Sequence, residues 1–230
     1  MSTGDSPFVS GLTQRDCPHL THYDTGAIYM NNMRDILKKY FIDDDLDKIE
    51  NTHLFIAGCG GLGSNIAHML VRSGFVKFTL LDHDTVEESN LNRQFYFPDQ
   101  VGLKKTQALA DNLTRLNPQL ELTLINGRLE SSYEVAALTE DCDILVEAFD
   151  SPESKAVFVS GAVPTGKPVI SASGIAGYGN TDDIIVRKRG ANLYLVGDGK
   201  SDVSDMPPLS PRVNVAAAKQ ADLVLAITLA

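Results

Sequence analysis

The sequence predicts an α/β fold: a Rossmann-like, doubly wound and mostly parallel sheet with helices on both faces. Two observations carry this prediction. Short apolar runs alternate with amphipathic stretches from residue 53 to residue 172, and a glycine-rich turn follows the first apolar run. Strands that alternate with helices favour a parallel sheet joined by right-handed crossovers. After residue 175 the alternation ends, and two further apolar runs predict an antiparallel C-terminal extension.

The expected elements follow one another at short intervals. Strands are expected where apolar residues run together, and helices where they recur at helical spacing. The predicted strands cover residues 53–57, 76–81, 121–125, 143–149, 168–172, 183–188 and 192–196. The predicted helices run from the glycine-rich turn to residue 74 and over residues 105–116, 133–139, 152–162 and 213–229.

The first fifty residues differ in composition from the rest. We expect them to form an arm and a helix ahead of a nucleotide-binding domain over residues 51–230. Residues 1–27 are rich in Ser, Thr, Gly, Pro and Asp, whereas residues 28–50 show an apolar side that predicts one helix, with the acidic run Asp43–Asp45 after it. Packing on the domain surface is the expected role of this helix, and contact with a partner subunit is the alternative.

Charge and cysteine content restrict the class of protein. The chain has 230 residues, with 20 Lys and Arg against 30 Asp and Glu, and a net charge of −10. Such a balance disfavours bulk electrostatic binding to nucleic acid or to an anionic membrane. The sequence shows no membrane span, no secretory signal and only three scattered cysteines. We therefore expect a reduced cytoplasmic protein without disulfides.

The turn GCGGLGS, residues 58–64, follows the first predicted strand and opens a helix. Glycine there permits a tight turn and lets backbone N–H groups approach a phosphate, which the partial positive charge of the helix N-terminus also favours. Asp82 ends the second strand, where a carboxylate can accept hydrogen bonds from ribose hydroxyls. This arrangement predicts nucleotide binding, although Asp82 could instead only stabilise a turn.

Polar residues at the carboxyl end of the predicted sheet indicate which kind of nucleotide binds there. Asn90, Arg93 and Gln94 lie in the loop after the second strand, and Lys105 opens the next helix. The two cations stand out in an acidic chain, and this pattern suits a triphosphate. Asp150 follows the fourth strand, where a carboxylate near phosphates is a natural Mg²⁺ ligand. Nothing specific to a nicotinamide is visible, which disfavours an oxidoreductase.

Each of these side chains has an ordinary structural alternative. Arg93 could pair with Glu87 or Glu88 at the surface. Lys105 could be a solvated lysine of a first helical turn, with the preceding lysine at the ligand instead. Asp150 could be only the N-cap of the next helix.

Five runs carry a more specific signal: GCGGLGS at 58–64, LLDHDTVEESNLNRQFYF at 80–97, VGLKK at 101–105, LNP at 116–118 and VEAFDSPESK at 146–155. Together they resemble the ThiF/MoeB/HesA family of adenylating enzymes, which are relatives of the ubiquitin-activating enzymes. The SNLNRQ portion of these motifs is far more specific than the glycines, and the resemblance covers about four-fifths of the chain. The tail from residue 173 is similar to a short ThiF-like subgroup that adenylates the sulfur carrier protein ThiS.

The resemblance implies an ATP-dependent adenylyltransferase (nucleotidyltransferase). In this family the C-terminal Gly-Gly carboxylate of a ubiquitin-like sulfur carrier attacks the α-phosphate of ATP, which releases pyrophosphate and forms an acyl-adenylate. The implied cofactors are ATP and Mg²⁺. The implied partners are a ThiS-like carrier and a second copy of the chain in a homodimer, and the implied process is thiamine (thiazole) biosynthesis.

Carried over position by position, the resemblance also implies a role for each motif residue. Arg93, Lys105 and Asp150 are the implied catalytic residues: the two cations stabilise the leaving pyrophosphate, and Asp150 holds Mg²⁺. The implied nucleotide-binding residues are Gly58, Gly60, Gly61, Gly63, Asp82, Asp84, Asn90, Arg93, Gln94 and Lys105.

The chain departs from the family pattern in three respects. It has no Cys-x-x-Cys pair, so no zinc is expected. Residues 175–212 hold no cysteine, which disfavours covalent catalysis, and we expect Cys59 and Cys142 to be buried structural residues. The N-terminal arginine that the family contributes across the dimer is not recognisable, with Arg15 and Arg34 as candidate replacements.

Three alternative functions remain beside the main one. The first is a related adenylating enzyme that acts on a tRNA base or a peptide, although the acidic composition disfavours tRNA. The second is a non-catalytic member that binds nucleotide. The third is a nicotinamide-dependent oxidoreductase, which the SNLNRQ run disfavours.

Overall fold

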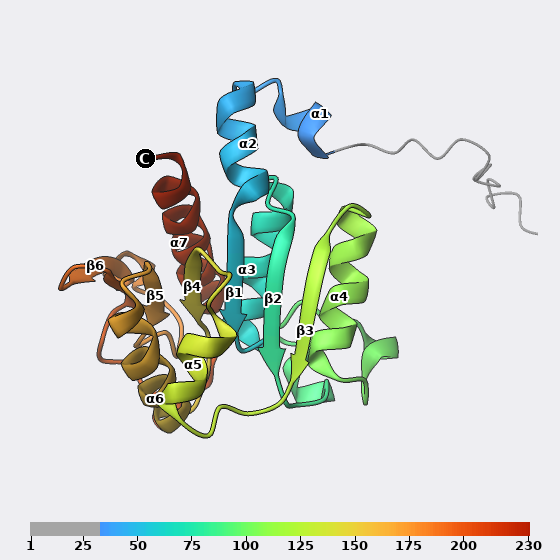
Figure 1. The fold of residues 1–230 in the computed structure, drawn as a ribbon. Helices are drawn as coiled ribbons and strands as arrows, with labels where there is room; N and C mark the ends of the chain where they lie inside the picture. Colours follow the sequence, from blue (N-terminus) through green and yellow to red (C-terminus); the bar gives the residue numbers. More distant parts are fainter. Residues whose placement is uncertain (1–32) are drawn as a thin grey trace, which may run out of the picture. The chain divides into compact units, whose positions relative to one another are not determined.

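One sheet of seven strands forms the centre of the computed structural model, which describes residues 33–230 (Figure 1). Its strand order is β3-β2-β1-β4-β5-β7-β6, and every neighbouring pair is parallel except β6 with β7. The predicted mostly parallel sheet with an antiparallel C-terminal extension is therefore confirmed. The strands are β1 (His53–Ala57), β2 (Lys77–Asp82), β3 (Glu121–Asn126), β4 (Ile144–Glu147), β5 (Val169–Ala172), β6 (Ile185–Arg189) and β7 (Leu193–Gly197).

Helices cover both faces of this sheet (Figure 1). Behind the strands in this view lie α3 (Gly61–Arg72), α4 (Lys105–Leu116) and α7 (Ser210–Leu229). In front of them lie α5 (Ser132–Leu138) and α6 (Pro152–Ala162). From β1 to the end of the chain, the ends of these helices and strands agree with the sequence prediction to within three residues. The connections carry four short 3₁₀ helices, η1 (Glu88–Asn90), η2 (Pro98–Gln100), η3 (Val163–Thr165) and η4 (Thr181–Asp183).

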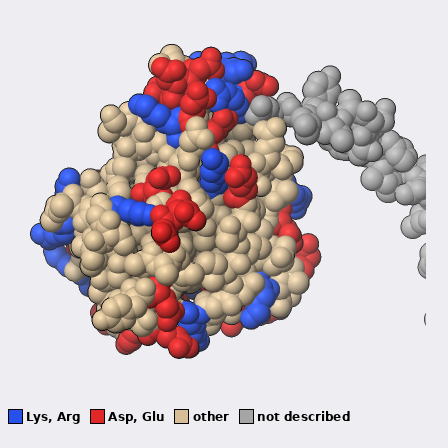
Figure 2. Space-filling model, viewed as in Figure 1, with Lys and Arg blue, Asp and Glu red and all other residues tan. Residues whose placement is uncertain are grey.

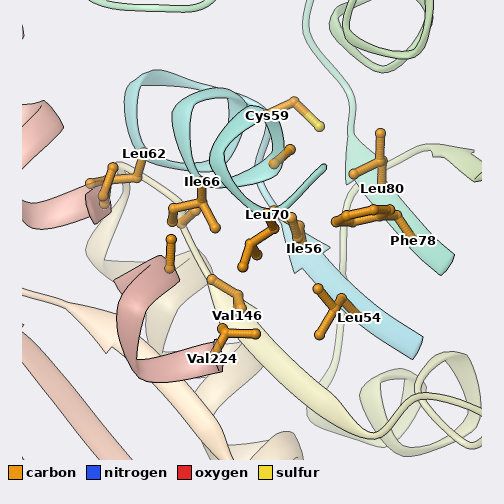
Figure 3. Packing of buried hydrophobic residues seen from close by; sticks show 14 of the residues in the cluster. Leu54, Ile56, Cys59, Leu62, Ile66, Leu70, Phe78, Leu80, Val146 and Val224 are labelled. Atoms are coloured by element: carbon orange, nitrogen blue, oxygen red, sulfur yellow. The ribbon is translucent and has the colours of Figure 1, made fainter. Parts of the chain in front are cut away.

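Successive residues of β1 enter two different hydrophobic cores. Leu54 and Ile56 pack with α3, α4 and α7, and Figure 3 shows this cluster from close by. Phe55 and Ala57 face α5 and α6 instead, where the rings of Phe55 and Phe158 lie 5.9 Å apart. A strand that is buried on both faces needs an apolar residue at each position, and this explains the unbroken apolar run of β1.

The strand order reverses between β1 and β4. From β1 the chain winds outward through β2 and β3, whereas β4 and β5 lie on the other side of β1. In doubly wound sheets, ligands bind beside such a reversal, at the carboxyl ends of the strands. The glycine-rich turn follows β1 and Asp150 follows β4, so the topology brings these two predicted features together.

The region before β1 differs from the single helix predicted over residues 28–50. The structure shows two short helices, α1 (Met33–Leu37) and α2 (Asp43–Asn51), while residues 28–32 lie outside the described part of the chain. Asp43–Asp45 form the first turn of α2 rather than following a helix, because the helix dipole favours carboxylates at that end. Helix α2 packs against α7, as expected for a surface helix. The domain boundary at residue 50 stays a prediction.

Charged side chains crowd the end of the molecule that carries α1 and α2 (Figure 2). Arg34 pairs there with Asp43 at 3.3 Å, Asp47 at 2.8 Å and Glu50 at 2.5 Å. Its hydrogen bonds with Asp47 and Glu50 raise the pKa of the guanidinium above its usual value. Arg34, a candidate for the N-terminal arginine of the family, is thus held by α2, and Arg15 lies outside the described residues. Within residues 33–230, no helix has the length and apolar character needed to cross a membrane.

Candidate functional site

A cavity of about 740 Å³ opens at the carboxyl end of the sheet, beside the reversal of strand order. This volume lies within the range of cavities that hold nucleotide-sized ligands. The lining residues come from the glycine-rich turn, from the connections that follow β2, β3, β4 and β5, from the 201–208 loop and from α7. All the predicted site residues except Gly63 and Asn90 line it, namely Gly58, Gly60, Gly61, Asp82, Asp84, Arg93, Gln94, Lys105 and Asp150.

The glycine-rich turn forms one wall of this cavity, and two of its glycines are required by the shape of the turn. Gly58 has a φ of +99°, and a Cβ there would lie 2.7 Å from the carbonyl oxygen of Ala148. A Cβ at Gly63 would collide with the carbonyl oxygen of Gly58, so Gly63 serves the packing of the turn rather than the lining of the cavity. A Cβ at Gly60 would meet only Nε2 of Gln94, at 3.8 Å, which is an ordinary van der Waals distance.

Asp82 holds the glycine-rich turn in place. One carboxylate oxygen accepts the N–H of Cys59 at 2.7 Å, and the other accepts the N–H of Asp84 at 2.8 Å. Asp82 therefore has the turn-stabilising role that was its structural alternative. It also lines the cavity, and each oxygen keeps a further lone pair for a ligand.

Tyr96 and Cys59 complete the support under the turn. The Tyr96 hydroxyl lies 2.7 Å from the carbonyl oxygen of Cys59 and 3.2 Å from that of Lys105, so it links the turn to α4. Burial raises the pKa of the Cys59 thiol well above its usual value. Cys59 and Cys142 are both buried, which confirms the burial expected of these cysteines.

Lys105 brings a positive charge into the cavity from the start of α4. It is only 7% exposed, and its Nζ donates a hydrogen bond to Oδ2 of Asp84 at 2.9 Å. Burial alone would raise the pKa of Asp84, but the hydrogen bond and charge of Lys105 outweigh burial, and the pKa lies below its usual value. Lys104 donates instead to the carbonyl oxygen of His83 and does not line the cavity, so the structure favours Lys105 of the two.

Arg93 brings a second positive charge, from the loop after η1. One terminal nitrogen donates to the carbonyl oxygen of Ser89 at 3.0 Å and to Oδ1 of Asn92 at 2.7 Å. The side chain of Asn65 in α3 holds the Arg93 carbonyl oxygen at 2.8 Å and so fixes the loop. Within the described residues, no ion pair joins Arg93 to a glutamate, so its surface-pair alternative finds no support.

Asn90 does not reach the cavity, contrary to the expected phosphate contact. Its side-chain oxygen accepts the N–H of Glu87 at 3.2 Å, and its amide nitrogen lies 3.3 Å from Oγ of Ser89. The residue is 7% exposed and stabilises η1 from within the loop. Short amide side chains often bond to nearby backbone in this way, and the motif alone could not reveal the choice.

Asp150 lies on the turn between β4 and α6, exposed and facing the cavity. The N-cap of α6 is Ser151, whose Oγ accepts the N–H of Ser154 at 3.1 Å, so the N-cap alternative for Asp150 is wrong. Among residues 33–230, no hydrogen bond or ion pair engages the Asp150 carboxylate. Free carboxylate oxygens beside a cavity of this kind fit the ligand preference of Mg²⁺.

A second group of possible metal ligands consists of Asp82, His83 and Asp84, whose ligand atoms lie within 4.8 Å of one another. Asp82 already accepts two backbone N–H groups, and Asp84 already pairs with Lys105. These carboxylates are therefore used in folding the loop. The uncommitted Asp150 fits a metal ion better.

Among the residues that line the cavity without a role from the sequence are Arg128 after β3, Lys155 in α6 and Ser173 after β5. Their place at the carboxyl end of the sheet was the only signal for Arg128 and Ser173. Lys155 lies within the motif at 146–155, but the motif does not say whether it faces the cavity or the protein.

A model of the ThiF family matches residues 32–224. This chain belongs to the ThiF family. The family resemblance inferred from the motifs is therefore confirmed. The match does not distinguish the ThiS-specific subgroup from other members.

Curated relatives of this ThiF-family chain include an activating enzyme and an adenylyltransferase. The chain is 34% identical over 144 residues to the ubiquitin-like modifier-activating enzyme 5 of Dictyostelium discoideum, a match that covers 57% of this chain and 37% of the relative. It is 33% identical over 143 residues to the molybdopterin-synthase adenylyltransferase of Escherichia coli (strain K12), a match that covers 62% of this chain and 57% of the relative. The chain thus spans less than two thirds of the length of either relative.

Two solved structures have a similar fold. The tRNA N6-threonylcarbamoyladenosine dehydratase TcdA of E. coli, in complex with AMP, has a TM-score of 0.77 at 20% identity, covering 86% of this chain and 94% of TcdA. At that identity the likeness shows the fold alone. The E. coli protein MccB, in complex with ATP, has a TM-score of 0.63 at 28% identity, covering 80% of this chain and 58% of MccB.

Proposed function

We propose that this ThiF-family chain is an ATP-dependent adenylyltransferase. The observation that carries the proposal is the charge arrangement of the cavity: Arg93 and Lys105 reach it from two different elements, and the free carboxylate of Asp150 faces it from a third. A relative that is named an adenylyltransferase and the ATP complex of MccB support this proposal.

In this proposal, the N–H groups of the glycine-rich turn and the N-terminus of α3 hold the phosphates of ATP. Asp82 accepts hydrogen bonds from the ribose, and Asp84 and Gln94 are further polar contacts on the same side. The small volume of Gly60 and Gly61 lets the nucleotide approach the backbone closely. Gly58 and Gly63 keep the turn in the shape that makes this approach possible.

The proposed reaction needs positioning and charge neutralisation more than covalent help from the protein. A carboxylate attacks the α-phosphorus of ATP, the new P–O bond forms, and the bond to pyrophosphate breaks. Arg93 and Lys105 stabilise the negative charge that gathers on pyrophosphate as it leaves, because they are held in place before the reaction. Asp150 would hold Mg²⁺, which when bound supplies positive charge beside the phosphates.

We further propose that the attacking carboxylate belongs to the Gly-Gly terminus of a ubiquitin-like sulfur carrier of the ThiS kind, in thiamine biosynthesis. The similarity of the tail from residue 173 supports this choice, as do relatives that act on ubiquitin-like modifiers by name. A homodimer, the absence of zinc and a cytoplasmic location complete the proposal.

ATP–pyrophosphate exchange with Mg²⁺ and candidate carriers ending in Gly-Gly tests the proposal. We expect exchange that depends on the carrier. Arg93→Ala and Lys105→Met should each lower its rate at least about 100-fold, because each removes a preorganised charge at the leaving group. The matched controls Arg115→Ala, on the exposed side of α4, and Lys104→Met should change the rate less than about two-fold.

Other results would contradict the proposal in distinct ways. ATP binding without exchange for any carrier would favour a non-protein acceptor, such as a tRNA base or a peptide, or a non-catalytic member. NAD binding without ATP binding would favour an oxidoreductase. Equal losses in Lys105→Met and Lys104→Met would remove the assigned role of Lys105.

A further inference from the structure

An ion pair between a buried glutamate and a half-buried lysine lies beside the turn that carries Asp150. Glu147, the last residue of β4, is fully buried, with 0% of its surface exposed. Its Oε1 accepts the N–H of Phe149 at 2.7 Å, and its Oε2 accepts the hydroxyl of Ser171 at 2.5 Å. Lys155 of α6 completes the group, with Nζ 3.0 Å and 3.1 Å from the two oxygens.

Lys155 lines the cavity, but its hydrogen bonds are directed at the protein. Its Nζ also donates to the carbonyl oxygen of Ala172, at 3.2 Å. An ammonium group has three N–H donors, and these three contacts account for them. Lys105 differs, because the only partner of its Nζ among the described residues is Asp84. The geometry therefore makes Lys155 a link between elements rather than a phosphate ligand.

We propose that the Glu147–Lys155 pair is a positioning device that presents the Asp150 carboxylate to the metal ion. The pair joins the end of β4, the first turns of α6 and the end of β5, and the Asp150 turn lies between the first two. Glu147 fixes this turn through the N–H of Phe149, the residue before Asp150. The proposal rests on the function proposed above, in which Asp150 holds Mg²⁺.

The charges of the pair are what make the turn rigid. A buried carboxylate without a counterion is strongly disfavoured and must take up a proton or recruit water. Without Lys155, the Glu147 side chain would therefore rearrange and release the N–H of Phe149. The glycine-rich turn would also be disturbed, because Gly58 lies against the carbonyl oxygen of Ala148 in the same segment. A metal ligand on a mobile turn binds more weakly than one that is held in advance.

The test compares Lys155→Met and Glu147→Gln with Lys155→Arg, which keeps the charge and the donors. Lys167→Met is the matched control. The Lys167 ammonium, like that of Lys155, is hydrogen-bonded within the protein, to the carbonyl oxygens of Thr139 and Glu140, but Lys167 does not line the cavity. Two quantities are measured in each variant. The first is the Mg²⁺ concentration that gives half-maximal ATP–pyrophosphate exchange, and the second is the rate of amide hydrogen exchange in residues 148–151. We expect the first to rise about 10-fold or more in Lys155→Met and Glu147→Gln. Faster hydrogen exchange of the Phe149 amide should accompany the raised Mg²⁺ requirement. Both quantities should stay near the wild-type values in Lys155→Arg and Lys167→Met.

A purely structural pair predicts a different result. The variants would then lose activity in proportion to the folded fraction, with an unchanged Mg²⁺ requirement and an unchanged Phe149 amide, and this result would overturn the proposal. If the single variants do not fold, the double variant Glu147→Gln/Lys155→Met removes both charges and decides the question by the same two measurements. If the wild type shows no ATP–pyrophosphate exchange, the proposed function fails. The amide hydrogen exchange of residues 148–151 still decides the positioning role.

Discussion

The Lys105–Asp84 pair sets the charge balance of the cavity at the scale of single residues. Because Lys105 keeps the pKa of Asp84 below its usual value, the folded protein favours the ionised carboxylate. The resulting stability is present above the usual Asp pKa of about 3.9 and is lost as the pH falls through the lower pKa of the folded state. The Asp84 side chain is 45% exposed, so the contribution should stay below about 1 kcal/mol.

Urea unfolding of wild type and Asp84→Asn checks this prediction. We expect the wild type to be the more stable at pH 7, and the difference to shrink below the usual Asp pKa and vanish once the pH is below the lowered pKa of the folded state. The same comparison in a Lys105→Met background should show a much smaller pH dependence, because the cause of the lowered pKa has been removed. If the stability difference between wild type and Asp84→Asn grew as the pH fell, the pKa of Asp84 would be raised in the folded state, which would contradict the role given to Lys105.

Single residues also show how far the motifs could be read. Spacing after predicted strands was enough to place Asp82, Arg93 and Lys105 at one cavity. It could not separate Asn90, which turns into its own loop, from Arg93, which stays at the cavity, because local hydrogen bonds decide between them. The N-cap of α6 was equally out of reach, since adjacent Asp150 and Ser151 are both good capping residues.

The glycine-rich turn is the element whose shape most directly forms the cavity. Substitutions at two of its glycines, with a control at a third glycine elsewhere, distinguish effects on folding from effects on nucleotide binding. Gly63→Ala places a Cβ against the carbonyl oxygen of Gly58, and we expect it to lower the free energy of unfolding by about 2–3 kcal/mol. Gly60→Ala meets nothing closer than 3.8 Å and should fold normally but weaken nucleotide binding, because its methyl group faces the cavity. Gly127→Ala meets no atom within 4 Å and is the control.

Thermal unfolding and nucleotide titration of the three variants give the two measurements. Loss of stability in Gly60→Ala equal to that in Gly63→Ala would show that the turn tolerates no side chain for reasons of folding alone. Normal stability of Gly63→Ala would contradict the close approach on which the packing argument depends.

At the scale of elements, the prediction worked best where one signal was strong. Helix α4 has the predicted ends because its apolar residues recur at helical spacing, and α6 begins as predicted because a proline, Pro152, marks its first turn. The single helix expected before β1 was wrong because apolar residues continue at helical spacing across the break at residues 38–42. The parallel pairing of β7 with β5 passes over the intervening strand β6, and no local pattern encodes it.

At the scale of the whole molecule, the connections between distant elements could not be read from the sequence. Glu147, Lys155 and Ser171 come from three elements and become one group only when β4, α6 and β5 are assembled. The same holds for Asn65, which steadies the Arg93 loop from α3. Motifs report residues that serve a ligand, whereas the residues that hold them in position depend on the tertiary fold.

Arg212 provides such a connection between the last helix and the loops that enclose the cavity. One terminal nitrogen lies 2.6 Å from Oδ2 of Asp198, and the other donates to the carbonyl oxygens of Gly179 and Asn180 at 2.7 Å and 3.0 Å. The two charged side chains are only 5% and 13% exposed. Burial would raise the pKa of Asp198, but backbone hydrogen bonds and the charge of Arg212 hold it below its usual value.

Removing one partner of the Arg212–Asp198 pair should therefore lower the free energy of unfolding far more than removing both. We expect Arg212→Met to lower the free energy of unfolding by about 3–5 kcal/mol, because it leaves Asp198 as an uncompensated buried charge. The double variant Asp198→Asn/Arg212→Met should recover a large part of this loss in urea unfolding. Simple additivity of the two single losses would contradict the coupling. Since Val213, the next residue of α7, lines the cavity beside the glycine-rich turn, the single variant should also weaken nucleotide binding more than the double variant does.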